Sequence, residues 1–501
     1  MTSEISRRFF LAAVSSLAAG RAIGATGTDG LAPASSAFPA PRTAEIARRA
    51  LAPVGDLVAR ANLGGKLSWV VADGLTGEVL EAQSPLLPMP PASVAKAVTA
   101  TYALETLGAG FRFRTRLLGT GPVVAGRLEG DLVLAGSGDP ILTTDNLSDL
   151  AAALKQAGLR EVAGRFLVDA SALPYQRVID PGQPDHLGYN PSVCGLNLNY
   201  NRVYFEWKRE PSGYRVSMDA RSEKYRPEVT ISRMQVVERK YPVYTYAQQG
   251  DTDRWTVARA ALGDGGGRWL PVRRPDLYAG EVFGWMARAR GIHLPGAQAA
   301  PGPVAGTLLA SHDSRELTEI TRLMLKNSVN LTAEVLGLTA SQARGARPPD
   351  LAASAAVMDQ WMGDYLDTRR AGMTDHSGLS DTSRLSAIDM VRALRRADGR
   401  LHGLLKEIVP LDDKGAARRD APYRIHAKTG SLNFVSTLAG YVETRSGRPL
   451  TFAIFTGDLE RRAAIAREMR ERPQGARGWG RRSRWLQHRL IDRWARLYDE
   501  A

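Results

Sequence analysis

Apolar positions in the N-terminal part of the chain predict a helix, a hairpin and a second helix. Between Thr43 and Ala61 the apolar residues recur at helical spacing, which indicates an amphipathic helix. The stretches 67–72 and 78–82 are strand-like and flank a turn-forming segment, which predicts a β-hairpin. The stretch 92–107 is apolar on nearly every side, so we expect a buried helix there.

The middle of the chain, roughly residues 106–304, mixes short strands with helices and contains no internal repeat. The hydrophobic pattern predicts strands at 132–135, 166–169, 202–207 and 228–232, and helices at 147–158 and 276–290. Beyond this region helical periodicity returns at 315–339 and 385–396. A second hairpin is predicted from 437–444, the turn 445–448 and 450–456.

The C-terminal tail, residues 459–501, has a composition of its own. It holds 12 arginines and 6 acidic residues, and one helical stripe consists of Leu486, Leu490, Trp494 and Leu497. This pattern predicts an amphipathic helix with an arginine-rich face. The helix can pack on the rest of the protein, or it can contact an anionic membrane or another protein.

The first 24 residues are typical of an export signal. Arg7 and Arg8 precede an apolar run at 9–20, and small residues follow, which resembles a twin-arginine signal peptide. The run is too short to span a bilayer. Residues 25–42 are small and rich in Pro, Ala and Ser, which predicts a disordered lead-in. We therefore expect a mature protein in the periplasm.

Charge and cysteine content exclude several classes of protein. The formal net charge is +14, but the signal peptide and the tail carry much of it, and an exported protein has little access to nucleic acid. Cys194 is the single cysteine, so an internal disulfide is impossible, and we expect a small, inert buried residue there. The seven histidines lack metal-ligand spacing. We expect no metal, no cofactor and no nucleic-acid partner.

A serine and a lysine are placed three residues apart in the predicted buried helix. Ser93 and Lys96 would lie on one face, one turn apart, near the helix N-terminus. Burial and the helix dipole both lower the pKa of a lysine here, so that a neutral amine could accept the serine proton. The chain has only ten lysines, and no other follows a serine at this spacing.

Two further motifs follow in order along the chain. Ser328 and Asn330 lie in the helical stretch 321–338, and Lys428-Thr429-Gly430 precedes Ser431 and a strand-like run. A cation and two hydroxyls can hold a substrate carboxylate, and a glycine lets a ligand approach a strand closely. Each motif alone has an ordinary structural explanation, such as a helix cap, a turn or a surface charge. Their joint order favours one class of enzyme.

With these motifs the sequence resembles the penicillin-binding protein and serine β-lactamase superfamily. The 235 residues between Ser93 and Ser328 make it similar to the low-molecular-mass class C penicillin-binding proteins, the D-alanyl-D-alanine carboxypeptidase/endopeptidases, which carry inserted domains there. The resemblance implies an α/β (α+β) transpeptidase-like domain, an antiparallel sheet with helices on both faces, formed by 43–105 and 305–501. Residues 106–304 would be inserted β-rich domains, with a smaller subdomain around 197–270.

The resemblance also implies a role for each motif residue. Ser93 would be the acylated nucleophile and Lys96 its general base, and Ser328 would relay a proton to the leaving amine. Asn330 would hold the substrate amide and steady Lys96, while Lys428 would complete the electrostatic environment. The expected substrate-binding residues are Thr429, Gly430 and Ser431, and the expected oxyanion hole is formed by the backbone N–H groups of Ser93 and Ser431. The substrate peptide would lie along this strand as an added strand.

The chain departs from the family at three places. In segment 375–381 the family usually has glycine and arginine where this chain has His376 and Asp381. We interpret these two residues as candidates for the rim of the site, with Arg384 as a candidate replacement for the arginine. The loop around 412–415 and the tail after Asp458 also lie outside the family pattern.

Three functions follow from this resemblance. The first is a serine DD-peptidase that cleaves D-Ala-D-Ala termini or D-Ala cross-links of peptidoglycan and is acylated by β-lactams. The second is a non-catalytic wall-binding or regulatory protein with the same fold, and the third is a β-lactamase. The intact motifs favour the first, and the 235-residue gap disfavours the third. The sequence leaves the balance of carboxypeptidase and endopeptidase activity open.

Overall fold

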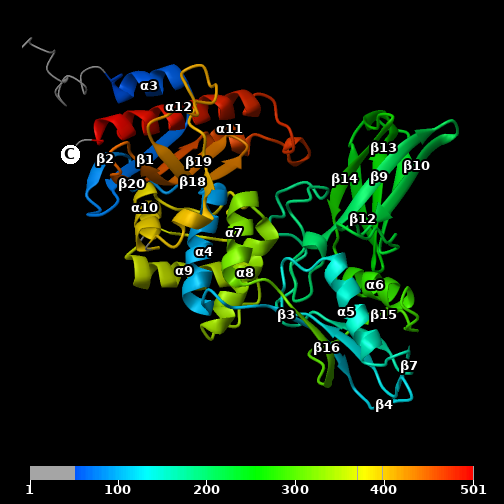
Figure 1. Cartoon of the computed structure of the whole chain (residues 1–501). Coiled ribbons are helices and arrows are strands. Elements are labelled where there is room, and N and C mark those ends of the chain that lie inside the picture. The colour runs from blue at the N-terminus through cyan, green and yellow to red at the C-terminus, as the bar shows by residue number, and fades with distance from the viewer. Residues whose placement is uncertain (1–50, 369–370, 398, 500–501) are drawn as a thin grey trace, which may run out of the picture. The chain divides into compact units, whose positions relative to one another are not determined.

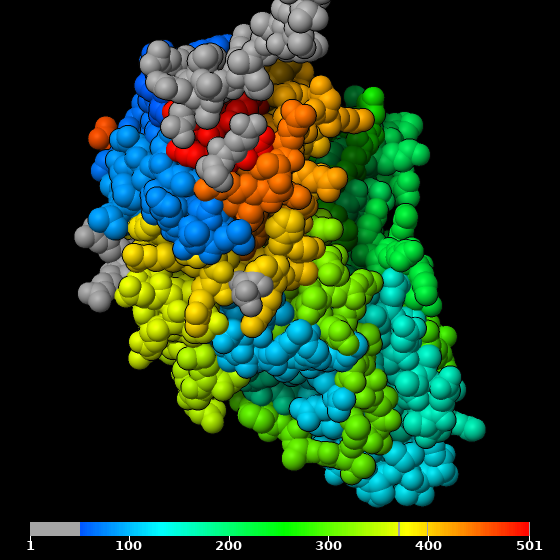
Figure 2. All heavy atoms as spheres, turned by 60° about the vertical axis from the view of Figure 1, so that its left-hand side comes forward, coloured from blue at the N-terminus to red at the C-terminus, as the bar shows by residue number. Residues whose placement is uncertain are grey.

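A six-stranded antiparallel sheet joins the two ends of the chain (Figure 1). The computed structural model describes residues 51–368, 371–397 and 399–499. The sheet has the order β17-β18-β19-β20-β1-β2. Its strands are β1 (Lys66–Asp73), β2 (Val79–Gln83), β17 (Lys406–Glu407), β18 (Arg424–Leu432), β19 (Val435–Glu443) and β20 (Pro449–Gly457). In the space-filling view the N-terminal surface, in blue, adjoins the orange and red C-terminal surface (Figure 2).

Both predicted hairpins are present in this sheet, as β1–β2 and β19–β20. The first turn is fixed by Asp73, whose carboxylate accepts hydrogen bonds from the N–H groups of Leu75 and Thr76 at 2.9 and 2.8 Å. Arg448, from the turn between β19 and β20, donates to the same carboxylate at 2.9 Å. The two turns are therefore tied together at one end of the sheet.

Helices cover both faces of the sheet. Side chains of a strand alternate between faces, so Val70 packs in one hydrophobic cluster and Val71 in another. The first cluster is shared with α4 (Ala95–Leu107), α7 (Leu317–Asn327), α8 (Asn330–Ala343), α9 (Leu351–Leu366) and α10 (Ala387–Arg396). The second is shared with α3 (Val54–Ala61) and α12 (Ala476–Leu497), which lie together on the other side of the sheet in Figure 1. This is the predicted antiparallel sheet with helices on both faces.

The apolar stripe of the tail belongs to this second cluster. Leu486, Leu490 and Trp494 are fully buried, and Leu497 is half-buried at the end of α12. Trp494 also donates from its indole Nε1 to the Glu81 carboxylate at 2.9 Å. The stripe is therefore core, and its buried side chains are not available to a membrane.

The middle of the chain forms four further sheets around a core of its own. The largest has the order β15-β8-β6-β3-β16 and packs with α5 (Thr144–Gln156) and α6 (Pro275–Arg288). Its strands are β3 (Arg114–Gly119), β6 (Leu132–Ala135), β8 (Phe166–Asp169), β15 (Ala297–Ala299) and β16 (Thr307–Asp313). The other three sheets have three strands each. One consists of β4 (Val123–Val124), β5 (Arg127–Leu128) and β7 (Glu161–Val162), and a second of β9 (Arg202–Glu210), β10 (Gly213–Asp219) and β14 (Gly265–Pro271). The third consists of β11 (Ser232–Val237), β12 (Tyr244–Gln249) and β13 (Thr252–Ala258). The exact domain boundaries stay a prediction.

Two predicted elements were wrong in detail. The predicted strand at 228–232 is present only at its last residue, where β11 begins at Ser232. The Glu281 carboxylate accepts the N–H groups of Thr230 and Ile231, which are therefore not used for strand pairing. The helical stretch 315–339 is two helices, α7 and α8, because Ser328 has left-handed backbone angles, with φ 58°. The predicted signal peptide, the lead-in and the start of the helix at 43–61 lie outside the described residues.

The described residues contain neither a membrane-spanning helix nor a cluster of metal-ligating side chains. Within these ranges no helix combines the length and the apolar character that crossing a membrane requires. The same residues contain no group of three or more His, Cys, Asp or Glu side chains able to hold a metal ion.

Candidate active site

Ser93 and Lys96 meet at the start of the buried helix. Ser93 lies in a 3-10 turn, η1 (Ala92–Val94), that continues directly into α4. Lys96 Nζ donates a hydrogen bond to Ser93 Oγ at 3.0 Å and another to the Ser377 carbonyl at 2.8 Å. The three-residue spacing therefore brings the amine to the hydroxyl.

Burial makes the Lys96 amine a usable base. The side chain is fully buried, which lowers its pKa from the ordinary 10.5 to about 8, while the charges of Glu334 and Asp375 act in the opposite direction. A larger fraction of this amine is neutral near pH 7 than of an exposed lysine. A neutral Lys96 can accept the proton of Ser93.

Ser328 and Lys428 form a second hydrogen-bonded pair. Lys428 Nζ donates to Ser328 Oγ at 3.0 Å and to the Thr429 carbonyl at 2.7 Å. Burial first, and then the charge of Lys96, lower the pKa of Lys428 to about 6. The left-handed conformation of Ser328, at the break between α7 and α8, places its hydroxyl at this amine.

Asn330 contacts the middle of the chain instead of Lys96. Its Nδ2 donates to the carbonyl of Tyr189 at 2.8 Å. Among the described residues no hydrogen bond joins Asn330 to Lys96, so the expected support of the amine by Asn330 stays a prediction. The sequence could not indicate this contact, because the two partners are 141 residues apart.

The free edge of β18 carries the third motif. β17 pairs with β18 only at His426 and Ala427, which leaves the edge from Lys428 to Leu432 without a neighbouring strand on that side. A Cβ at Gly430 would lie 2.1 Å from Thr437 Oγ1 and 2.9 Å from the backbone N of Ser93. Glycine thus lets the strand approach the nucleophile.

Residues of the first two motifs and Ser431, which follows the third, line one cavity of about 350 Å³, whereas Thr429 and Gly430 are not in its wall. Ser93, Ser328, Asn330 and Ser431 are in its wall, and Lys96 and Lys428 are buried behind the two serines. The sequence did not predict the remaining polar residues of the wall, which are Gln183, Tyr189, Asn433, Arg462, Arg470 and Glu471. They come from the middle region, the β18–β19 turn and the tail, and no motif marks them.

The candidate rim residues need correction. His376 is fully buried, its Nε2 lies 2.8 Å from Ser354 Oγ, and burial lowers its pKa to about 3. It is therefore a packed core residue. Asp381 Oδ2 accepts from Arg462 Nε at 2.9 Å, and Arg384 donates to backbone carbonyls. Arg384 does not line the cavity, whereas Arg462 does.

Two buried carboxyl groups hold the loop that supports Lys96. Glu334 accepts the N–H groups of His376 and Ser377 at 2.9 Å each, and Asp375 accepts two further N–H groups of the same loop. Burial first, and then the charge of Asp375, raise the pKa of Glu334 above its ordinary value. Glu334 lies four residues after Asn330, and this helical spacing is the signal that could have identified it.

The packing of this loop on α8 leads to a prediction at Gly337. A Cβ at this position would lie 2.1 Å from His376 Cγ, so Gly337→Ala is expected to lower the free energy of unfolding by about 1–3 kcal/mol. In the control Gly363→Ala, within α9, the Cβ would lie 3.6 Å from Thr368 O, and a gain of about 0.5–1 kcal/mol is expected. Chemical denaturation measures the free energy of unfolding of both variants. Unchanged stability of Gly337→Ala would contradict this packing.

Comparison with known proteins gives a consistent match. The family model described as the D-Ala-D-Ala carboxypeptidase 3 (S13) family matches residues 51–472. The D-alanyl-D-alanine carboxypeptidase DacB of Haemophilus influenzae is 26 % identical over 437 residues, which cover 81 % of this chain and 89 % of the relative. A D-alanyl-D-alanine carboxypeptidase of Actinomadura sp. is 27 % identical over 419 residues, covering 77 % and 76 %.

A solved structure shows the same fold. The crystal structure of penicillin binding protein 4 (dacB) from Haemophilus influenzae aligns with a TM-score of 0.70 at 22 % sequence identity, covering 87 % of this chain and 99 % of that chain. The fold class predicted from the sequence is thereby confirmed.

Proposed function

Because this chain belongs to the D-Ala-D-Ala carboxypeptidase 3 (S13) family, it is a serine DD-peptidase of peptidoglycan, and we propose that Ser93 is its nucleophile. The observation that best supports this proposal is the 3.0 Å hydrogen bond from Lys96 Nζ to Ser93 Oγ, in the wall of a cavity that Ser328 and Ser431 also line. A non-catalytic wall-binding protein would have no need for a buried amine beside this hydroxyl.

The proposed reaction has two steps. Lys96 accepts the proton of Ser93 Oγ, which attacks the carbonyl carbon of the penultimate D-Ala, and the N–H groups of Ser93 and Ser431 stabilise the oxyanion. Ser328, hydrogen-bonded to Lys428, relays the proton that Lys96 has accepted to the leaving nitrogen as the C–N bond breaks, and Lys96 is neutral again. Lys96 then takes a proton from water, which attacks the acyl-serine ester, and returns it to Ser93 Oγ as the ester C–O bond breaks.

The free edge of β18 is the proposed place for the substrate peptide. An extended peptide there would pair with the backbone of 428–432 as an added strand. Thr429 and Ser431 are exposed on this edge and would bind the terminal carboxylate. Asn330 donates from Nδ2 to Tyr189, and this leaves its Oδ1 for the N–H of the substrate amide.

We further propose that β-lactams acylate Ser93 by the same attack and act as covalent inhibitors. The strained ring amide takes the place of the peptide bond, and its leaving nitrogen stays attached to the acyl group. A structure of penicillin binding protein 4 from Haemophilus influenzae complexed with a β-lactam is similar, with a TM-score of 0.64, 22 % identity and coverage of 82 % of this chain and 95 % of that chain.

The proposed site of action is the periplasm, after export by the twin-arginine route. Arg7, Arg8 and the short apolar run at 9–20 support this proposal, as does the extracellular location of peptidoglycan.

Digestion of purified muropeptides tests the proposed function. Wild-type protein is expected to release D-Ala from a pentapeptide monomer, to split a D-Ala cross-linked dimer, or both, whereas Ser93→Ala should do neither. Chromatography of the products measures the balance of carboxypeptidase and endopeptidase activity. Product formation by Ser93→Ala at the wild-type rate would contradict the proposed mechanism.

A further inference from the structure

A groove with a positive wall continues from the catalytic cavity. It has a volume of about 340 Å³ and lies between the end of the β18–β19 hairpin and the first turns of α12. The hairpin residues 431–433 line both cavities. Arg477, Arg481 and Arg484 line the groove from α12, and we call it the arginine groove. A peptide that passes Ser431 along β18 would reach these guanidinium groups.

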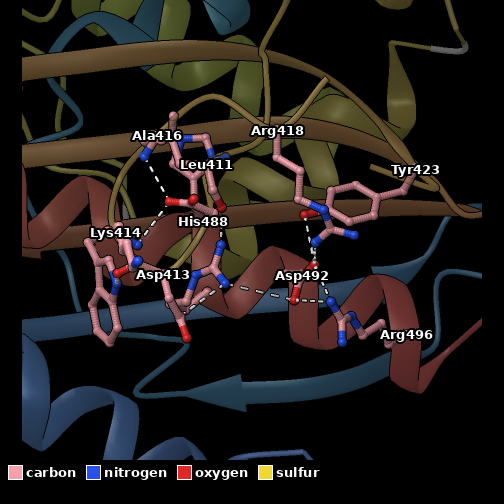
Figure 3. A network of polar contacts seen from close by, with 12 residues as sticks. Leu411, Asp413, Lys414, Ala416, Arg418, Tyr423, His488, Asp492 and Arg496 are labelled. Atoms are coloured by element: carbon pink, nitrogen blue, oxygen red, sulfur yellow. Dashed lines mark hydrogen bonds and ion pairs between the residues drawn. The ribbon is translucent and has the colours of Figure 1, made fainter. Parts of the chain in front are cut away.

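These three arginines have no hydrogen-bond or ionic partner in the part of the chain that the structure describes. The other arginines of α12 do have partners. Arg482 donates to two carbonyls at the end of α3, and Arg489, Arg493 and Arg496 pair with Asp413, Glu81 and Asp492. Figure 3 shows this paired side of the helix, where Asp492 lies between Arg418 and Arg496. The unpaired arginines are those that line the groove.

Their position on α12 is also unfavourable for the helix itself. Arg477 and Arg481 are four residues apart and Arg484 follows three later, so like charges are neighbours on one face. They lie in the first half of the helix, where the dipole is positive, and its first turn has no acidic residue. No acidic residue occurs between Glu471 and Asp492. Three exposed guanidinium groups without a partner among the described residues thus lie together along one wall of the groove, where an anion from outside the chain can bind.

The catalytic cavity itself adds one more cation. Arg462 is 4 % exposed, lines the cavity beside the hairpin end and leaves Nη2 without a partner among the described residues. Guanidinium groups bind carboxylates with paired hydrogen bonds. Peptidoglycan stem peptides carry free carboxylates unless these are amidated. The family match ends at residue 472, so the three arginines of the groove lie beyond the matched segment, whereas the hairpin residues 431–436 lie within it.

We propose that the arginine groove binds free carboxylates of the stem peptide beyond the scissile bond, and that it makes the enzyme prefer substrates whose carboxylates are not amidated. This inference rests on the proposed function, because it needs the substrate to enter along β18. The groove lies outside the catalytic machinery, so binding there should affect KM and leave kcat unchanged.

The test compares two cross-linked muropeptide dimers, one with free carboxylates and one with these carboxylates amidated. For the variant Arg477→Gln/Arg481→Gln/Arg484→Gln, KM for the free dimer is expected to rise about tenfold at low salt, with kcat unchanged. KM for the amidated dimer should change less than twofold. The control Arg233→Gln/Arg254→Gln/Arg419→Gln removes the same charge from exposed positions that lack ionic partners among the described residues, and should leave both KM values unchanged.

Three results would overturn the inference. The first is that the triple arginine variant changes KM equally for the dimer with free carboxylates and for the amidated dimer. The second is that the control variant raises KM as much as the triple arginine variant does. The third is that the triple arginine variant loses binding to anionic lipid vesicles while its KM for both dimers is unchanged. Acylation of Ser93 by labelled penicillin is measured in every variant. If the wild-type protein itself is not acylated, the proposed function is wrong. If acylation is intact but KM for the dimer with free carboxylates does not rise in the triple arginine variant, only the proposed role of the arginine groove is wrong.

Discussion

Replacing Lys96 by methionine is expected to slow the acylation of Ser93 about a thousandfold while the protein stays folded. The amine donates to Ser93 Oγ at 3.0 Å, and among the described residues no other side chain is hydrogen-bonded to this hydroxyl. Methionine fills a similar buried volume without the cost of desolvating an amine, so the unfolding temperature should not fall. The time course of labelled penicillin binding measures the rate.

The matched control is Lys406→Met, which makes the same substitution at an exposed lysine on β17. It should leave acylation within twofold of wild type. Acylation of Lys96→Met at the wild-type rate would remove Lys96 as the base.

The pH dependence of acylation follows from the same amine. A base must be neutral, and the pKa of Lys96 is about 8, so the wild-type rate should fall as the pH is lowered through 8. Where Glu334 is ionised, its negative charge raises the pKa of Lys96, and Glu334→Gln removes that charge, so the midpoint of the profile should move to lower pH. A shift to higher pH would contradict the assignment.

Replacing Lys428 by methionine is expected to lower the acylation rate about a hundredfold. Its amine holds Ser328 Oγ at 3.0 Å, so without it the hydroxyl loses the partner that orients it toward the leaving nitrogen. Ser328→Ala should lower the acylation rate by a similar factor.

The double variant distinguishes a functional pair from two independent residues. If Ser328 and Lys428 act as a unit, Lys428→Met/Ser328→Ala should be no slower than either single variant. If the factor by which the double variant slows acylation equals the product of the two single-variant factors, the two residues act separately. Rates of penicillin acylation for the four proteins give this comparison.

The sequence predicted the parts of the site that depend on local spacing. Ser93 and Lys96 meet because they are one helical turn apart, and both hairpins were visible as paired strand-like runs around turn residues. Hydrophobic periodicity indicates such short-range regularities. It does not indicate a single residue with left-handed backbone angles, so the sequence predicted one continuous helix where the chain breaks at Ser328.

Contacts between segments that are distant in the sequence account for the remaining differences between the predicted site and the structure. Asn330 meets Tyr189, and Asp381 meets Arg462, through pairings that only the folded chain creates. Arg462 of the tail lines the cavity and donates to Asp381, and no sequence motif marks it. His376 was predicted at the rim, but the missing side chain of Gly337 makes room for its ring in the core.

The most direct test of the central claim is the mass of the purified mature protein after incubation with a labelled penicillin, followed by peptide mapping. The account predicts one covalent adduct, located on Ser93, and none on Ser93→Ala. Wild-type protein without an adduct, or an adduct that persists in Ser93→Ala, would contradict it.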